Sequence, residues 1–274
     1  MKKKHTHSKN NNMQLVLLFL LFVFLLIVVS ISIRFFTILQ KSKFDGDHRF
    51  TVAVSYVNKT TPIDIISFDT GSKTVDSVRI TKPVSINSIS NFLEIPIDAN
   101  VQFKSAQTKQ LSYNDIKSLL QNIVFYHVPK TTLTIIDAAR LWFFMNSEPN
   151  VVISTVAISP ATSDLNKDKL VSPLFIDSAV VQDQKTIVVV NGTDTIGLGN
   201  RLSKFIDNIG GNVIEISNAD TPVNNSSIAY YGNKTYTVDK MQKILNFPLY
   251  KLEKPGISDM IITIGEKQLT TIPF

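Results

Sequence analysis

Cysteine is absent from this chain of 274 residues, and histidine occurs only four times. A chain without thiols forms no disulfide, no zinc-thiolate site and no cysteine nucleophile. His5 and His7 lie in a polar N-terminal tail, and neither His48 nor His127 is part of an H-x-x-x-H or H-E-x-x-H motif. The sequence therefore predicts no metal site and no cofactor, and it indicates that packed apolar cores stabilise the fold.

The two common nucleotide-binding motifs are missing as well. Residues 187–190 read Ile-Val-Val-Val, as in a buried strand, and the loop at 191–199 leads into a helical pattern at 202–209. A dinucleotide fingerprint has the form G-x-G-x-x-G, but Gly197 and Gly199 are followed by leucine at the third position, and no P-loop Gly-Lys-Ser/Thr occurs. The glycines are therefore interpreted as allowing the helix to begin close to its strand.

A basic surface is missing from most of the chain, although the net charge is +6. Seven of the 28 basic residues flank an apolar segment near the N-terminus, which leaves 21 against 22 acidic residues elsewhere. The excess charge belongs to the flanks of this segment, so nucleic acid is not an expected partner. The seven flanking cations are Lys2, Lys3, Lys4, Lys9, Arg34, Lys41 and Lys43.

The apolar segment itself is the strongest signal in the sequence. Residues 15–33 carry no charge, and a helix of this length extends about 28 Å, nearly the hydrocarbon thickness of a bilayer. A cleaved signal peptide would have a shorter apolar region and a small-residue cleavage site, whereas Ser32 is followed directly by Ile33 and Arg34. The sequence favours an uncleaved signal anchor at residues 13–36, so the lipid bilayer is the first predicted partner.

The remainder of the chain alternates strand and helix patterns, which predict an α/β (α+β) fold. In the central part, strand patterns at 51–57, 63–68 and 75–80 precede two helices capped by Ser112 and Thr134. In the C-terminal part, the order β-α-β-β-α-β predicts a ferredoxin-like split domain. The predicted segments are a basic tail (1–12), the anchor (13–36), a juxtamembrane linker (37–49), a central region (50–159), a turn-rich linker (160–184) and a C-terminal domain (185–274).

The aromatic run Trp142-Phe143-Phe144 in the second of these helices has two interpretations. It could form a surface that faces the membrane or stacks on a ligand, or it could belong to the core. The sequence favours the core, because a buried helical stripe accounts for two of the three rings. The residues that helical spacing places on one face are Ile135, Ala138, Ala139, Trp142 and Phe143.

Six short pieces follow one another in the C-terminal part: NGT at 191–193, GLG at 197–199, GGNVI at 210–214, NAD at 218–220, SIAYY at 227–231 and DMIITIG at 259–265. Together they resemble the C-terminal domain of LytR-CpsA-Psr cell-envelope proteins. The resemblance covers about the last third of the chain. The candidate ligand-binding residues in its glycine loop are Asn191, Gly192, Thr193, Gly197 and Gly199.

Three pieces of the central region are DIISF at 64–68, ITKPV at 80–84 and LEIPID at 93–98. They resemble the catalytic domain of the same family, whose enzymes transfer a glycopolymer from a polyprenyl pyrophosphate lipid to the cell wall, using arginines and an aspartate-bound magnesium. The resemblance implies Asp64, Arg79 and Lys82 as remnants of that site. Lys82 stands where the family has arginine, and Pro83 where it has aspartate, so the bidentate fork and one metal ligand are lost.

These patterns predict a single-pass membrane protein whose extracytoplasmic part binds or organises cell-envelope components without catalysis, with cell-wall glycopolymer or envelope proteins as partners. Two alternatives stay open: a glycopolymer phosphotransferase, which would need magnesium, and a membrane-bound regulator. A tail of about a dozen residues has no room for a DNA-binding fold, so direct transcriptional regulation is the weakest hypothesis. Under the non-catalytic hypothesis, replacing Asp64, Arg79 and Lys82 by alanine is expected to leave the envelope phenotype unchanged.

The distribution of cations also predicts the orientation of the anchor. Four lysines precede the apolar segment and three cations follow it, so the positive-inside rule places the N-terminus in the cytoplasm and the remainder outside. Protease added to intact cells is expected to digest the chain beyond about Lys43 and to spare the N-terminal tail, as followed with epitope tags at both ends. A C-terminal tag that is cleaved only after lysis would contradict this orientation.

Overall fold

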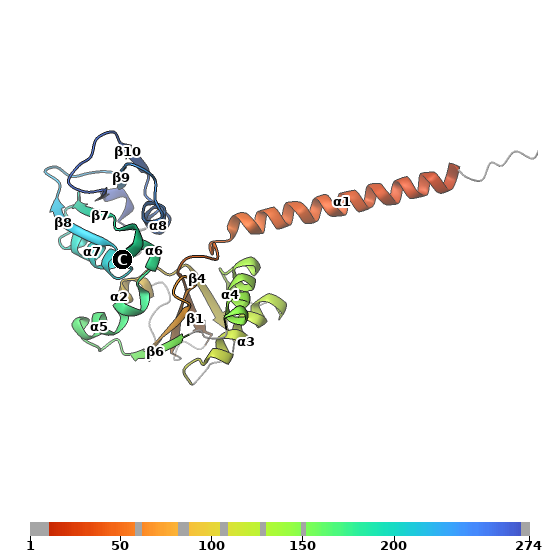
Figure 1. Cartoon of the computed structure of the whole chain (residues 1–274), viewed down its shortest axis with the longest axis horizontal. Coiled ribbons are helices and arrows are strands. Elements are labelled where there is room, and N and C mark those ends of the chain that lie inside the picture. The colour runs from red at the N-terminus through yellow and green to blue at the C-terminus, as the bar shows by residue number, and fades with distance from the viewer. Residues whose placement is uncertain are drawn as a thin grey trace, which may run out of the picture. The chain divides into compact units, whose positions relative to one another are not determined.

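The computed structural model describes residues 11–57, 62–81, 88–104, 109–126, 130–148 and 152–269. The chain divides into two compact units, Met1–Ser42 and Lys43–Phe274. The first contains α1 (Asn11–Lys41), one uninterrupted helix of 31 residues (Figure 1). At about 46 Å it exceeds the hydrocarbon thickness of a bilayer. Its stretch from Met13 to Lys41 is apolar enough to span a membrane, and no part of the most apolar stretch is buried against other residues of the chain.

The second unit contains two mixed β-sheets, of which the first has six strands in the order β5-β4-β1-β2-β3-β6. Strands β1, β2 and β3 form an antiparallel meander, which confirms the three predicted strand patterns. β4 pairs parallel with β1, β6 pairs parallel with β3, and β5 pairs antiparallel with β4. The strands are β1 (Phe50–Tyr56), β2 (Ile63–Asp69), β3 (Thr74–Ile80), β4 (Ala99–Phe103), β5 (Lys130–Thr131) and β6 (Val152–Ile158).

Helices pack on both faces of this sheet, because its central strands are apolar on both sides. On β2, Ile66 and Phe68 lie in the core shared with α3 and α4, whereas Ile65 lies in the core shared with α2 and α5. The predicted cap of α4 is confirmed: Thr134 and Asp137 form a capping box. The helices are α2 (Ile89–Leu93), α3 (Tyr113–Tyr126), α4 (Ile135–Ser147) and α5 (Asp164–Phe175).

The segment at 160–184, expected to be a turn-rich linker, contains two helices. α5 covers most of its first half, and α6 (Ser178–Asp183) follows. Val171 and Phe175 of α5 are buried against the six-stranded sheet. The expectation of a linker without helices is therefore wrong, because two apolar side chains at helical spacing are enough to hold a polar helix on a sheet.

The inward face of α4 also differs from the expected one. Leu141 and Met145 are buried, while Phe143 is 68% exposed and Ile135 is also exposed. Two of the three rings of the aromatic run do contribute to the core, as expected, but they are Phe144 and the half-buried Trp142. Most sides of α4 are apolar, so its local pattern does not determine which stripe meets the sheet.

The second sheet has five strands in the order β10-β9-β11-β7-β8 and confirms a mixed α/β unit. Its pairing differs from the expected ferredoxin-like split, because β7 and β8 are adjacent and parallel, as are β9 and β10. β11 lies between the two pairs, and β10 was not expected. The elements are β7 (Thr186–Asn191), α7 (Leu198–Asp207), β8 (Asn212–Asn218), β9 (Ser227–Tyr231), α8 (Tyr236–Leu245), β10 (Leu249–Leu252), β11 (Met260–Ile264) and the 3-10 turn η2 (Glu266–Gln268).

Gly210 ends the turn after α7 in the left-handed conformation that the sequence predicts, with φ of +89°. A Cβ atom there would lie 2.6 Å from Val181 Cγ2 and 3.1 Å from Ile176 Cγ2. The turn therefore packs directly on the segment around α6. Among the described residues, every buried apolar side chain lies in the second unit, beginning with Phe44, so residues 43–274 contain all of these cores.

Gly210→Val is expected to lower the free energy of unfolding of residues 43–274 by about 2–5 kcal/mol, because backbone strain and overpacking add. Gly232→Val is the matched control, since Gly232 has φ of +79° but no neighbouring atom within 4 Å of a Cβ. The control should show the strain alone, about 1–3 kcal/mol. Urea unfolding followed by circular dichroism measures both, and equal losses would contradict the packing role of Gly210.

Candidate functional site

Asp64 and Arg79, two of the three predicted remnant residues, are partners inside the six-stranded sheet. They lie opposite each other on β2 and β3. Arg79 Nε donates to Asp64 Oδ1 at 2.7 Å, and Nη2 donates to Oδ2 at 2.8 Å. Tyr56 adds a hydroxyl bond to Oδ2 at 3.3 Å. Asp64 is 0% exposed and Arg79 is 6% exposed, so the guanidinium fork binds a carboxylate of its own chain.

The pairing of Asp64 with Arg79 limits the chemistry that these two residues can perform. Bonding to Asp64 raises the pKa of Arg79, and burial raises the pKa of Tyr56, so the arginine stays charged and the hydroxyl stays neutral. A phosphate-binding group must be reached by its ligand, and neither member of the pair is accessible. Alanine variants at these two positions therefore test folding and not catalysis, so the expectation that the triple alanine variant leaves the phenotype unchanged is withdrawn: loss of the buried pair destabilises the fold. Lys82 lies outside the described residues.

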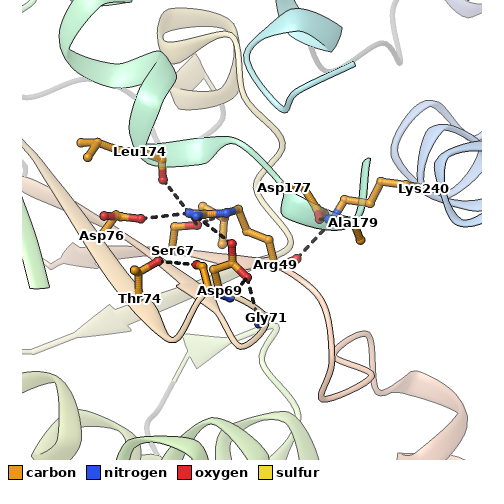
Figure 2. Close-up of polar contacts among 12 residues, drawn as sticks. Arg49, Ser67, Asp69, Gly71, Thr74, Asp76, Leu174, Asp177, Ala179 and Lys240 are labelled. Carbon is orange, nitrogen blue, oxygen red and sulfur yellow. Dashed lines mark hydrogen bonds and ion pairs between the residues drawn. The ribbon is translucent and has the colours of Figure 1, made fainter. Parts of the chain in front are cut away.

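A second buried arginine, Arg49, lies on the opposite face of the same sheet. Its Nη1 donates to Ser67 Oγ at 2.9 Å and to Asp76 Oδ2 at 3.1 Å, and its Nη2 donates to Asp69 Oδ2 at 3.1 Å. The carbonyl of Leu174, in the last turn of α5, accepts from Nη1 at 2.5 Å (Figure 2). We call these five residues the Arg49 cluster. Burial raises the pKa of Asp76, and Arg49 opposes that shift.

The Arg49 cluster connects to the second sheet through α8. Lys240 Nζ donates to the carbonyl oxygen of Arg49 at 3.1 Å and lies 3.5 Å from Asp177 Oδ2 (Figure 2). The Tyr236 hydroxyl donates to the same carboxylate oxygen at 2.7 Å. His48, next to Arg49, stacks on the Tyr236 ring with centroids 3.9 Å apart. Residues of the six-stranded sheet and of α8, which packs on the second sheet, therefore share one polar network.

Sequence reasoning missed this network. It placed Arg49 in a juxtamembrane linker, whereas both Arg49 and Phe44 are buried in the second unit. A signal was present in the strands, because Ser67, Asp69 and Asp76 are polar at positions where a strand covered on both faces should be apolar. Buried polar residues of this kind require partners, which a single sequence does not identify.

The predicted glycine loop lines a groove of about 420 Å³ in the second sheet. The groove lies at the carboxyl ends of the parallel strands β7 and β8 and at the start of α7, where ligands bind in many open α/β sheets. Four of the five candidate residues line it: Asn191, Thr193, Gly197 and Gly199. The other lining residues are Asp194, Thr195, Ile196, Asn200, Ile216, Ser217 and Asn218.

Side-chain hydrogen bonds of Asn191 and close backbone packing stabilise the glycine loop. Asn191 Nδ2 donates to the carbonyl of Thr195 at 3.0 Å, and its Oδ1 accepts from the Thr193 hydroxyl at 2.8 Å. Gly199 lies so close to β8 that a Cβ would be 2.9 Å from Ile216 Cγ2, which supports its interpretation as a packing glycine. Gly192 does not line the groove, because its Cα packs on Val223, where a Cβ would be 2.6 Å from the side chain.

The lining of the groove is polar and almost uncharged. Among the described lining residues, hydroxyl and amide groups come from Thr193, Asn200 and Asn218, and Asp194 is the one ionisable side chain. The groove therefore offers an anion no cationic side chain from this part of the chain. Its mixture of neutral donors and acceptors, beside the 98% exposed Ile196, matches a sugar, which has hydroxyls at its edges and an apolar ring face. Within the described residues, no group of three or more His, Asp or Glu side chains could hold a metal ion.

Comparison with known proteins gives partial structural similarity. No model of a protein family and no curated protein matches the chain. The transcriptional regulator yvhJ from Bacillus subtilis is 11% identical over 45% of this chain and 94% of its own, with a TM-score of 0.33. The LytR-CPS2A-psr family protein YwtF (TagT), with bound octaprenyl pyrophosphate lipid, is 14% identical over 43% and 80%, with a TM-score of 0.28. Lin1025 from Listeria innocua is 10% identical over 82% and 94%, with a TM-score of 0.19. Scores below 0.5 assign neither a fold family nor a function.

Asp64→Ala is expected to lower the free energy of unfolding of residues 43–274 by about 3–5 kcal/mol, because Arg79 would remain buried without its partner. The matched control is Glu148→Ala, which removes a pair with the exposed Lys73 at 3.0 Å and should change stability by less than about 1 kcal/mol. Replacing the buried pair together, as Asp64→Leu with Arg79→Met, should restore much of the loss. Urea unfolding that shows no loss for Asp64→Ala would contradict the structural role of the pair.

Proposed function

We propose that this protein is a single-pass membrane protein whose extracytoplasmic part binds cell-wall glycopolymer and helps to organise the bacterial cell envelope. Its location is supported by α1, which is long and apolar enough to span a membrane, and by the lysine excess before that helix. The resemblance of residues 185–274 to an envelope-protein domain supports the same location.

The observation that carries the binding function is the neutral polar groove at the carboxyl ends of β7 and β8. A glycopolymer repeat presents hydroxyl and amide groups, which pair with the side chains of Thr193, Asn200 and Asn218. Asn200 and Asn218 are exposed and therefore free to bond a ligand without rearrangement of the fold. A groove open at the surface also accommodates one part of a long polymer, which an enclosed cavity would not.

The non-catalytic part of the proposal rests on the two buried arginines. Transfer from a pyrophosphate lipid requires cations or a bound metal at the phosphates. Arg79 binds Asp64, and Arg49 binds Asp69 and Asp76, so both guanidinium groups are held by carboxylates within the fold. These arginines therefore stabilise the sheet and do not serve as phosphate ligands.

The double variant Asn200→Ala with Asn218→Ala tests the groove. Co-sedimentation of residues 43–274 with bacterial sacculi that carry wall glycopolymer should weaken about tenfold, because two ligand hydrogen bonds are lost. Asn122→Ala, at an exposed position of α3, is the matched control and should bind as the parent does. Sacculi stripped of glycopolymer should retain little of either protein.

Two results would contradict the proposal. Equal binding of the groove variant and the Asn122→Ala control would exclude the groove as the binding site. Magnesium-dependent release of polyprenyl phosphate from a pyrophosphate-linked substrate by residues 43–274 would replace the binding function with the phosphotransferase alternative.

A further inference from the structure

An aromatic surface lies on the α3–α4 side of the six-stranded sheet. Phe143 is 68% exposed and Phe125 is 56% exposed, and Phe125 packs edge-on against Trp142 with ring centroids 6.0 Å apart. We call Phe125, Trp142 and Phe143 the aromatic face. Exposed rings that gather in one place are uncommon on soluble surfaces and mark a contact with a partner or a membrane.

The aromatic face borders an open, mainly apolar groove of about 780 Å³. Phe44, Val124, Trp142 and Phe143 are among its lining residues, and Arg140 lies at the same surface with its guanidinium donating to the carbonyl of Phe44. Asp47 and Glu148 also line the groove, and Lys73 pairs with Glu148. The surface therefore combines an apolar floor, the indole of Trp142 between two phenylalanine rings, an exposed arginine and two carboxylates at its edge.

The groove beside the aromatic face is close in sequence to the end of α1. Phe44 follows the last residue of α1, Lys41, by three positions, and three extended residues reach at most about 11 Å. The groove is thus lined by the segment through which the chain passes from α1 into the second unit. This surface is therefore joined to α1 by a short segment of chain, whereas the glycine-loop groove belongs to the other sheet.

We propose that the aromatic face inserts into the interfacial layer of the outer leaflet and thereby sets the orientation of the second unit against the membrane. The occupant is the lipid surface itself, because aromatic side chains with arginine match the boundary between headgroups and acyl chains. Arg140 is placed to meet lipid phosphates while Phe143 enters the acyl region. This inference rests on the membrane anchoring in the proposed function, and it concerns a different surface from the polymer groove.

Trp142 is the single tryptophan of the chain, so its fluorescence reports on this surface directly. The full chain is reconstituted in phosphatidylcholine nanodiscs with and without bromine on the acyl chains, which quenches tryptophan on contact. Emission is expected to fall about twofold in brominated discs, since interfacial side chains are buried about 5–10 Å into the boundary. The matched control is Trp142→Phe with Ile196→Trp, which moves the only indole to a 98% exposed position in the loop between β7 and α7 and should not be quenched.

Phe143→Ser supplies the second test, because an exposed side chain can be changed without loss of the fold. It should reduce the quenching of Trp142 while the thermal unfolding of the protein stays the same. Quenching of Trp142 no greater than that of the Ile196→Trp control, in discs that retain the protein, would overturn the aromatic-face proposal and leave the anchoring intact.

Two other outcomes separate the remaining explanations. A chain that does not stay with the discs would overturn the anchoring in the proposed function, and the aromatic-face proposal with it. Equal quenching of residues 43–274 by a short-chain brominated lipid below its micelle concentration would show that the groove takes single lipid molecules, and it would overturn contact with the lipid surface.

Discussion

The guanidinium of Arg49 forms the hydrogen bonds that join two strands and one helix of the second unit. It bonds β2 through Ser67 and Asp69, β3 through Asp76, and α5 through the carbonyl of Leu174. A buried cation is stable only with its partners in place, so none of these elements can move away without leaving uncompensated charge. Its own carbonyl accepts from Lys240 of α8, which extends the constraint to the second sheet.

The same constraint limits the chemistry available to the six-stranded sheet. Of the five arginines in the chain, Arg49, just before β1, and Arg79, in β3, place their side chains on opposite faces of this sheet, and each is bonded to aspartate. Because carboxylates of the fold already bind both guanidinium groups, these two arginines act as structural groups in the buried sheet.

Two surfaces of different chemistry remain for function, and they occur on different sheets. The groove at the ends of β7 and β8 is polar and nearly uncharged, which suits a hydrated polymer. The face around Trp142 is apolar and aromatic, which suits a lipid boundary. The two proposals together describe a protein that holds a polymer at one surface and a bilayer at another, which requires no chemical reaction.

The sequence by itself determined the features that depend on neighbouring residues. The apolar helix, the three strands β1 to β3, the helix cap at Thr134, the left-handed Gly210 and the loop that lines the polar groove all follow from local spacing and backbone preference. The tertiary structure decided which strands pair, which side of α4 faces inward, and which partners Asp64 and Arg49 take. These depend on contacts between residues far apart in the chain, where several arrangements bury the same apolar residues and only the packed fold selects one.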